Sequence, residues 1–432
     1  MKKSLARLLA LLTLPALVTL AFAQTPADAI VPNPELRASL EIWSWEGATG
    51  ALQAADAAFA EYYPNIEITY VNRPTGDNYQ QIQLGAVAGG GLPDVANIEN
   101  SHLRQFVELG ILHDLTDRMA PYVPLMNAFK WREAEMDGRY YAMPNDSGPV
   151  ALFYRRDVFE QAGVNADDIQ TWADYYEAAK VIKAATGLPM WQQATARNNA
   201  RLFEILMWQR GTGYIDADGN VILDRDENTL QILEFMGRFW QEGLAVDAEE
   251  WTDSWYRNFD APAVASHPGA VWMGTFFKSW IAPDSAGQWG VIRLPAWESG
   301  GSQASNDGGS SLVIFEQSRQ KEAAWAYVEF HLGRTASQLD MFVASDIFPS
   351  LETVYAEPYF SEADPYYGGQ MVRQLFTQIV QEIPEAGIYN VDYQEMNGLM
   401  AEQIQRFAIG QITAQEALTA AAREIRSRTG RR

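Results

Sequence analysis

The sequence predicts an α/β protein in which strands and helices alternate along the chain. Apolar and polar residues alternate over 66–70, as in a half-buried strand, whereas apolar residues recur every three or four positions over 52–62, as on one face of a helix. The alternation of helix and strand continues across the triple glycine at 89–91, with a helix expected before it and a strand after it. The same alternation extends to the C-terminus without an internal repeat, which places the chain in the α/β class.

The first unit of this pattern covers residues 40–70. A strand is expected at 40–43, and a second one at 66–70 begins after the break at Pro64 and Asn65. The helix between them carries its apolar stripe at Leu52, Ala55, Phe59 and Tyr62. A strand–helix–strand unit of this kind implies parallel strands joined by a right-handed crossover.

The remaining elements are justified by the same two periodicities and by glycine or proline at their ends. In chain order we expect a helix over 77–88, a strand over 93–98, helices from Thr171 to about 186 and over 227–242, a strand over 290–295, a glycine- and serine-rich loop over 299–311, a strand over 312–315, a helix over 319–332, and two helices within 392–427 separated near Gly410.

The first residues have the organisation of a secretory signal peptide. The positive residues Lys2, Lys3 and Arg7 precede an apolar run over 8–21, and Ala21–Ala23 offers a cleavage site after Ala23. The run is too short to span a bilayer comfortably, although an uncleaved anchor is the alternative. We therefore expect residues 1–23 to be removed and residues 24–37, which contain three prolines and no periodicity, to form a leader.

The composition excludes several kinds of chemistry. The chain has no cysteine, so disulfides, thiolate metal sites, cysteine nucleophiles and lipid attachment through an N-terminal cysteine are excluded. The formal charge of −23 would become −26 after loss of the signal peptide, which carries the basic residues Lys2, Lys3 and Arg7. Such a negative surface repels nucleic acid and anionic lipid. The length of 432 residues suggests two or three domains. The 14 tryptophans exceed what the core of a soluble chain usually requires.

Several sequence blocks follow one another in an order that resembles a known family. They are Trp43–Glu46, Gly91–Val95, Gly138–Pro144, Leu152–Phe159, Thr171–Asp174, Ala270–Gly274, Gly308–Ile314, Ala323–Val328 and Gly410–Leu418. In this order they resemble the extracellular solute-binding proteins of ABC importers, in the branch that includes maltose-binding protein. The resemblance covers most of residues 38–430.

The resemblance implies a type II periplasmic-binding-protein fold, with two lobes, a hinge and a ligand cleft between the lobes. The N-terminal lobe would comprise 38–146 and 292–333, and the C-terminal lobe 147–291 and 334–432. It also implies a periplasmic or extracellular protein without a lipid anchor, monomeric, without a cofactor or catalytic activity, that binds a neutral mono- or oligosaccharide and delivers it to a membrane permease.

A sugar site needs aromatic faces for the C–H groups and carboxylate or amide acceptors for the hydroxyls. In the first lobe, residues of these types follow the expected strands, where open α/β sheets place ligands. They are Trp43, Trp45, Glu46, Asn97, Glu99 and, at the expected hinge, Asp146. Trp43 could equally belong to the core, Glu99 could be a solvated helix cap, and Asp146 could serve a turn.

The second lobe supplies further candidates. They are Trp191, Trp251, Trp255, Trp272, Gly274 and Phe277. Asn306, Asp307 and Gly308 lie on the loop expected to face the cleft from the first lobe. Residues 272–277 resemble the family's Trp-x-Gly-Gly-x-Trp block, in which the last aromatic commonly stacks on the sugar. Here Phe277 and Thr275 replace the usual Trp and Gly, which puts maltodextrin specificity in doubt. The pair Trp251 and Trp255 could instead be a buried helix face.

Four other functions remain as alternatives. A ferric-ion site could use adjacent tyrosines, of which Tyr366–Tyr367 is free of an obvious structural role. An aromatic box could bind a quaternary amine. A glycan-cleaving enzyme would need a carboxylate pair, but no pair stands at a fixed spacing. A calcium loop over 216–227 lacks the expected glycine, because Val221 stands there, and Asp218–Gly219 also favours a hairpin.

Overall fold

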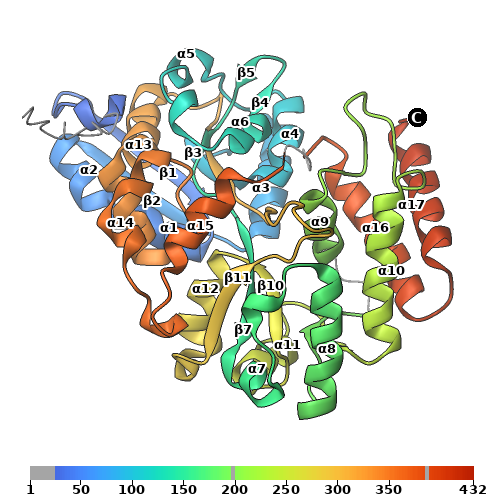
Figure 1. Ribbon diagram of the computed structural model, residues 1–432. Helices are drawn as coiled ribbons and strands as arrows, with labels where there is room; N and C mark the ends of the chain where they lie inside the picture. The colour runs from blue at the N-terminus through green and yellow to red at the C-terminus, as the bar shows by residue number, and fades with distance from the viewer. Residues whose placement is uncertain (1–24, 196–199, 385–388) are drawn as a thin grey trace, which may run out of the picture.

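The computed structural model describes residues 25–195, 200–384 and 389–432, so the expected signal peptide lies outside the described residues. Two separate sheets organise the chain and confirm the α/β class. Figure 1 shows the elements around β1, β2 and β3 on one side and those around α8, α9 and α10 on the other. The molecule therefore has the expected two lobes.

The sheet of the first lobe has five strands in the order β2-β1-β3-β12-β6. Their bounds are β1 (Ala38–Ser44), β2 (Ile66–Asn72), β3 (Val95–Glu99), β6 (Met143–Pro144) and β12 (Ser310–Ile314). β1 pairs in parallel with β2 and β3, as the strand–helix–strand pattern predicts, whereas β12 runs antiparallel to β3 and β6. The carboxyl ends of β1 and β3 consequently meet at one edge.

Helices cover this sheet. They are α1 (Glu46–Ala54), α2 (Asp56–Tyr62), α3 (Thr75–Ala88), α4 (Asn100–Glu108), α5 (Thr116–Met119), α6 (Ala128–Ala134), α13 (Lys321–Gly333) and α14 (Thr335–Ser345), with the short hairpin β4 (Glu135–Met136) and β5 (Arg139–Tyr140) beside them. The single helix expected over 52–62 is therefore two helices that meet at Ala55. Ala55 and Phe59 still point into the core, so the apolar stripe was identified correctly.

The second lobe is built on the antiparallel sheet β10-β7-β11. Its strands are β7 (Val150–Arg155), β10 (Ser266–Ala270) and β11 (Trp289–Arg293), and β8 (Trp191–Gln192) pairs separately with β9 (Ala245–Val246). Its helices are α7 (Arg156–Ala162), α8 (Trp172–Thr186), α9 (Arg201–Gln209), α10 (Glu227–Gln241), α11 (Asp253–Asp260), α12 (Trp272–Phe276), α15 (Val372–Gln381), α16 (Tyr393–Ala408) and α17 (Ala414–Thr429).

Local chemistry explains why the helix predictions hold in this lobe. The Thr171 hydroxyl accepts from the Asp174 amide while the Asp174 carboxylate accepts from the Thr171 amide, a reciprocal cap that starts α8. Gly187, at φ 79°, ends the same helix in a left-handed conformation. The apolar stripes of α8 and α10 are both buried in the core of the second lobe, which includes Trp172, Phe235 and Phe239.

Two expected boundaries differ from the structure. Helix α14, assigned from the sequence to the C-terminal lobe, packs against α1 and α13 of the first lobe. Residues 25–29, expected in a leader, pack there too: Ala27 is fully buried and the Thr25 hydroxyl donates to the Gly333 carbonyl at 2.6 Å. Both placements depend on contacts between residues that are far apart in sequence, which local sequence patterns do not predict.

The lobes are joined by chain segments that run side by side. The Val150 amide donates to the Ser305 carbonyl at 3.0 Å, and the Asp307 amide donates to the Gly148 carbonyl at 2.8 Å. On the other side, the Ser147 amide donates to the Phe348 carbonyl at 2.9 Å. Segment 346–350 links α14 to the short helix Glu352–Ala356, which packs on α14, so it runs beside the junction within the first lobe. We call the two joining segments (145–150 and 305–310) the crossing strands. Among the described residues, no helix is both long and apolar enough to cross a membrane.

Candidate ligand-binding site

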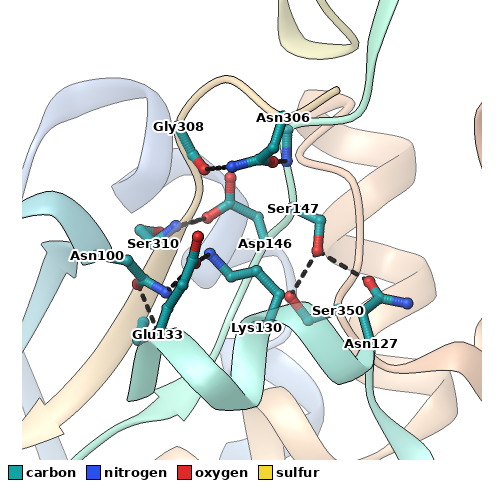
Figure 2. A network of polar contacts seen from close by, with 12 residues as sticks. Asn100, Asn127, Lys130, Glu133, Asp146, Ser147, Asn306, Gly308, Ser310 and Ser350 are labelled. Atoms are coloured by element: carbon teal, nitrogen blue, oxygen red, sulfur yellow. Dashed lines mark hydrogen bonds and ion pairs between the residues drawn. The ribbon is translucent and has the colours of Figure 1, made fainter. Parts of the chain in front are cut away.

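Asp146 lies on the crossing strand 145–150 and belongs to a polar network (Figure 2). Its Oδ1 accepts from the Ser310 amide at 2.8 Å and from the Ser310 hydroxyl. Burial raises the pKa of Asp146, although the nearby Lys130 ammonium and the Ser310 donors oppose the shift. The carboxylate is thus held in place by the adjacent crossing strand, and Asp146 as a whole residue is half-buried.

A buried ion pair stands behind Asp146. Lys130 is fully buried, and its Nζ lies 2.7 Å from the Glu133 Oε2. Glu133 Oε2 also accepts from the Asn100 Nδ2 at 2.7 Å, and the Asn100 Oδ1 accepts from the Ser311 hydroxyl at 2.8 Å. Each charge therefore has a partner, as a buried ion pair requires.

Gly309 makes room for this ion pair. At φ 101° its backbone is in a region that favours glycine, and a Cβ built there would lie 2.5 Å from the Lys130 Nζ and 2.8 Å from the Asp146 carbonyl oxygen. The Gly308–Gly309 sequence therefore serves the turn and also allows the Lys130 ammonium to lie close to the backbone at Gly309.

A second group of residues forms the other half of the site. We call it the Arg201 cluster, and it consists of Arg201, Glu250, Trp251, Trp272 and Asp307. Arg201 Nε lies 3.4 Å from the Glu250 Oε2, and its Nη1 lies 3.3 Å from the Asp307 Oδ2. Its guanidinium carbon lies 5.3 Å from the centre of the Trp251 ring and 5.6 Å from that of Trp272. The two rings are stacked with centres 5.9 Å apart.

The crossing strand 305–310 connects the two halves. The Trp272 Nε1 donates to the Asp307 carbonyl at 3.1 Å, so the indole is tied to this strand. The Asn306 Oδ1 accepts from the Gly148 amide at 3.1 Å, and its Nδ2 donates to the Gly308 carbonyl at 2.9 Å. The strand that bonds Asp146 therefore also positions the Arg201 cluster.

Three carboxylates influence one another in this region, Glu99 at the end of β3 in the first lobe and Asp146 and Asp307 on the crossing strands. Glu99 accepts from the Tyr79 hydroxyl at 3.0 Å. Burial raises the pKa of Glu99, and Arg201 lowers it while Asp146 and Asp307 raise it. Burial also raises the pKa of Asp307, against the effect of Arg201. Asp146, Asp307 and Arg201 thus all lie near enough to Glu99 to influence its pKa, and among these charged groups acceptors outnumber cations.

A small cavity opens beside the Arg201 cluster. Its volume of about 20 Å³ has room for roughly one water. Besides the cluster itself, its lining includes Gln192, Trp255 and His267. Burial, followed by the influence of Arg201, lowers the pKa of His267 to about 3, so this imidazole is neutral at ordinary pH. In this state the aromatic side of the site is closed by its own side chains.

The structure brings together part of the predicted set. Trp251, Trp255, Trp272 and Asp307 line one cavity, although Trp255 is buried, and Asn306 and Gly308 lie on the same strand as Asp307. Asp146 and Asp307 both influence the pKa of Glu99. Trp45 is half-buried and Glu46 exposed at the start of α1, where neither makes a side-chain cap.

Other predicted residues lie in the cores, which corrects the expectation for them. Phe277 is fully buried and stacks on Trp289 with centres 4.7 Å apart, so it offers no face to a ligand. Trp191 is fully buried among the aromatic rings of the second lobe. Gly274 packs so closely that a Cβ would lie 2.8 Å from the Tyr367 hydroxyl oxygen.

Two predicted residues of the first sheet are also buried. The Trp43 Nε1 donates back to the Glu41 Oε1 at 2.6 Å, and its ring lies 4.2 Å from the Arg73 guanidinium carbon. Asn97 lies fully buried within β3. Strand alternation could not decide this, because both faces of β1 and β3 are covered by helices.

No local sequence pattern singles out Arg201, Glu250, Lys130 or His267 as residues of the site. Arg201 and Glu250 lie 49 positions apart, and Arg201 lies 106 positions from Asp307, so spacing carries no information about their contact. Lys130 lies in α6, five of whose seven residues are buried, whereas a lysine is rarely fully buried in a protein. Long-range packing alone makes these residues part of the site.

The metal alternatives find no support among the residues described here. No group of three His, Asp or Glu side chains in 25–195, 200–384 and 389–432 is arranged to hold a metal ion. Tyr366 and Tyr367 are buried, and the Tyr366 hydroxyl donates to the Ala282 carbonyl at 2.8 Å. The Asp216 carboxylate accepts from the amides of Asp218 and Asn220, as in a hairpin turn rather than a calcium loop.

Comparison with known proteins agrees with this geometry. Residues 44–336 match the model of the family described as bacterial extracellular solute-binding protein. The chain is 27% identical over 384 residues to the arabinooligosaccharide-binding protein of Bacillus subtilis, covering 85% of this chain and 86% of that protein. It is 29% identical over 381 residues to the lactose-binding protein of Rhizobium radiobacter, covering 84% and 86%. A solved ABC transporter-associated binding protein from B. animalis subsp. lactis, in complex with beta-1,6-galactobiose, superposes with a TM-score of 0.76 at 25% identity, covering 90% and 97%.

Proposed function

Since this chain belongs to the bacterial extracellular solute-binding protein family, we propose that it captures a neutral mono- or oligosaccharide between its lobes and delivers it to an ABC importer. The observation that carries the proposal is the stacked indole pair Trp251 and Trp272, which lines one cavity together with the carboxylates of Glu250 and Asp307. Trp251 and Trp272 can offer faces to the C–H groups of a sugar ring, while Glu99, Asp146 and Asp307 can accept from its hydroxyls.

The relatives support an oligosaccharide in particular. The names of two of them specify arabinooligosaccharide and lactose, and the solved neighbour holds a galactobiose. Sugars of more than one unit need several contact groups spread across both lobes, which the two halves of this site provide. Asp146 and the Arg201 cluster would then contact different parts of one ligand.

The proposal has a cellular side. We expect an exported protein that loses residues 1–23, carries no lipid anchor because it has no cysteine, acts as a monomer, and docks on a membrane permease. We also expect binding without catalysis, because capture and release is the task of an importer's binding component.

A cationic solute is the second candidate. The guanidinium of Arg201 lies against Trp251 and Trp272 and pairs with Glu250 and Asp307, so this surface already accommodates a cation. A quaternary amine would use the same rings and the same carboxylates.

Isothermal titration of the mature protein with a saccharide panel tests the proposal. The panel comprises arabinobiose, arabinotriose, lactose, beta-1,6-galactobiose and maltotriose, with glycine betaine as the cationic probe. A neutral sugar that binds should also raise the melting temperature, because a ligand at about 100 times its Kd stabilises the folded state by about 2.7 kcal/mol. Binding of betaine with no sugar binding would replace the saccharide proposal by the cationic one.

A further inference from the structure

Arg201 holds the position from which a ligand would contact the aromatic rings. It opens α9, whose N-terminal end carries no side-chain cap, and its own side chain is 31% exposed. The guanidinium approaches Trp251 and Trp272 at similar distances, so it bridges rings that come from different elements. A planar cation over indole faces is attracted by the ring quadrupole.

Two carboxylates fix the guanidinium in this position. Glu250 approaches its Nε at 3.4 Å and Asp307 its Nη1 at 3.3 Å, and both acids are less exposed than the arginine, at 19% and 11% of the side chain. The acceptors that a sugar hydroxyl would use are therefore already engaged. The remaining space, about 20 Å³, cannot admit a sugar ring.

Trp251 adds an independent observation. Its side chain is 40% exposed although it contacts Trp255, Trp272 and Arg201, and its backbone has φ 65°. A positive φ is unfavourable for a bulky residue and persists only where surrounding contacts hold it. Contacts within the cluster thus maintain a conformation of Trp251 that the backbone alone disfavours.

We propose that Arg201 is a specificity-determining residue that occupies the place of the ligand on Trp251 and Trp272 and is displaced when the ligand binds. Displacement frees Glu250 and Asp307 to accept from ligand hydroxyls, so the carboxylates exchange a guanidinium for neutral donors. The site consequently favours ligands rich in hydroxyl groups and disfavours anions, which would meet these acids without the arginine. This inference rests on the proposed saccharide function.

Removal of the arginine should therefore strengthen binding. Titration of the sugar identified from the panel into wild type, Arg201→Ala and Arg201→Lys measures the change in Kd. We expect Arg201→Ala to bind about tenfold more tightly, corresponding to about 1.4 kcal/mol, and Arg201→Lys to fall between it and wild type because an ammonium group retains the charge but not the planar stacking. Melting curves without ligand confirm that the variants are folded.

Arg210→Ala is the matched control. Arg210 also lies over an indole, 4.9 Å from the centre of Trp297, and also pairs with a polar side chain, the Gln231 Oε1 at 2.8 Å, but it lies outside the Arg201 cluster. Its removal should leave the Kd unchanged. A glucuronic-acid-containing disaccharide should bind wild type and Arg201→Ala more weakly than the neutral sugar.

The outcomes separate the two proposals. If wild type binds a sugar and Arg201→Ala binds it equally or more weakly, Arg201 is a ligand contact or a bystander and the displacement inference is wrong, while the saccharide function stands. If only Arg201→Ala binds, the inference is supported. If neither protein binds any saccharide, removal of Arg201 exposes no sugar site, and both proposals fail.

Discussion

Substitution of Lys130 by methionine should destabilise the protein strongly. The Lys130 side chain is fully buried and lies 2.7 Å from Glu133, whose side chain is only 7% exposed. Methionine fills a similar volume but leaves Glu133 with the Asn100 amide as its remaining hydrogen-bond donor among the described residues. Removing one partner of a buried ion pair typically costs about 3–5 kcal/mol, because the remaining charge is buried without compensation. Urea denaturation followed by tryptophan fluorescence measures the change in the free energy of unfolding.

The exposed pair Glu177–Lys180 is the matched control. It has the same three-residue spacing and the same nitrogen–oxygen distance of 2.7 Å, but its side chains are 65% and 42% exposed. Lys180→Met should therefore produce little or no measurable change. The double variant Lys130→Met/Glu133→Leu should recover much of the loss, because it removes both buried charges. Equal effects of Lys130→Met and Lys180→Met would refute the reasoning that burial makes the first pair critical.

Three further predictions concern the same region. Trp251→Ala should abolish or weaken sugar binding at least about tenfold, whereas Trp280→Ala, which removes another exposed indole (49% exposed), should not. Gly309→Ala should destabilise the folded protein by about 2–4 kcal/mol, because the new Cβ meets the buried Lys130 ammonium at a residue with positive φ. Gly300→Ala also has a positive φ but has free space around the new Cβ, so it should cost about 1 kcal/mol. Equal losses would show that the contact with Lys130 is unimportant. Burial lowers the pKa of His267 to about 3, so this histidine takes up a proton at higher pH in the unfolded chain than in the folded one. The free energy of unfolding of wild type should therefore fall as the pH drops from about 6.5 toward 3, and that of His267→Gln should fall less over the same interval. Denaturation at a series of pH values measures this, and parallel curves for the two proteins would contradict it.

Local patterns predicted the helices α3, α8, α10, α13, α16 and α17 and the strands β1, β2, β3, β11 and β12, because these patterns depend on neighbours in sequence. The apolar stripe of α10 repeats from turn to turn and the reciprocal cap of α8 lies within its first turn, and both elements appear where expected. The misassigned α14 shows the limit. Its packing on α1 joins residues about 290 positions apart, which no local periodicity encodes.

The site was predicted in part for the same reason. Asp146, Asp307 and Trp272 stand at crossing strands or strand ends, where topology places ligands, so their positions followed from the expected fold. Phe277 was expected to be a platform by resemblance, but the ring turns toward Trp289 in the core. Arg201 was missed because its role depends on two acids and two rings from distant segments.

The position of the site on the crossing strands has a mechanical consequence. Asp146 and Asp307 are not carried on flexible loops away from the hinge but lie on adjacent backbone segments that connect the lobes. Any rotation of one lobe relative to the other must change the backbone geometry that aims these carboxylates. A ligand that bonds both acids therefore has a different affinity for each lobe arrangement, which is the condition for binding to shift the equilibrium between them. The exchange of Arg201 for a neutral ligand would act at the same place, because Asp307 forms an ion pair with Arg201 and also lies on a crossing strand. In this protein, ligand recognition and the signal to a transporter would consequently depend on the same few residues.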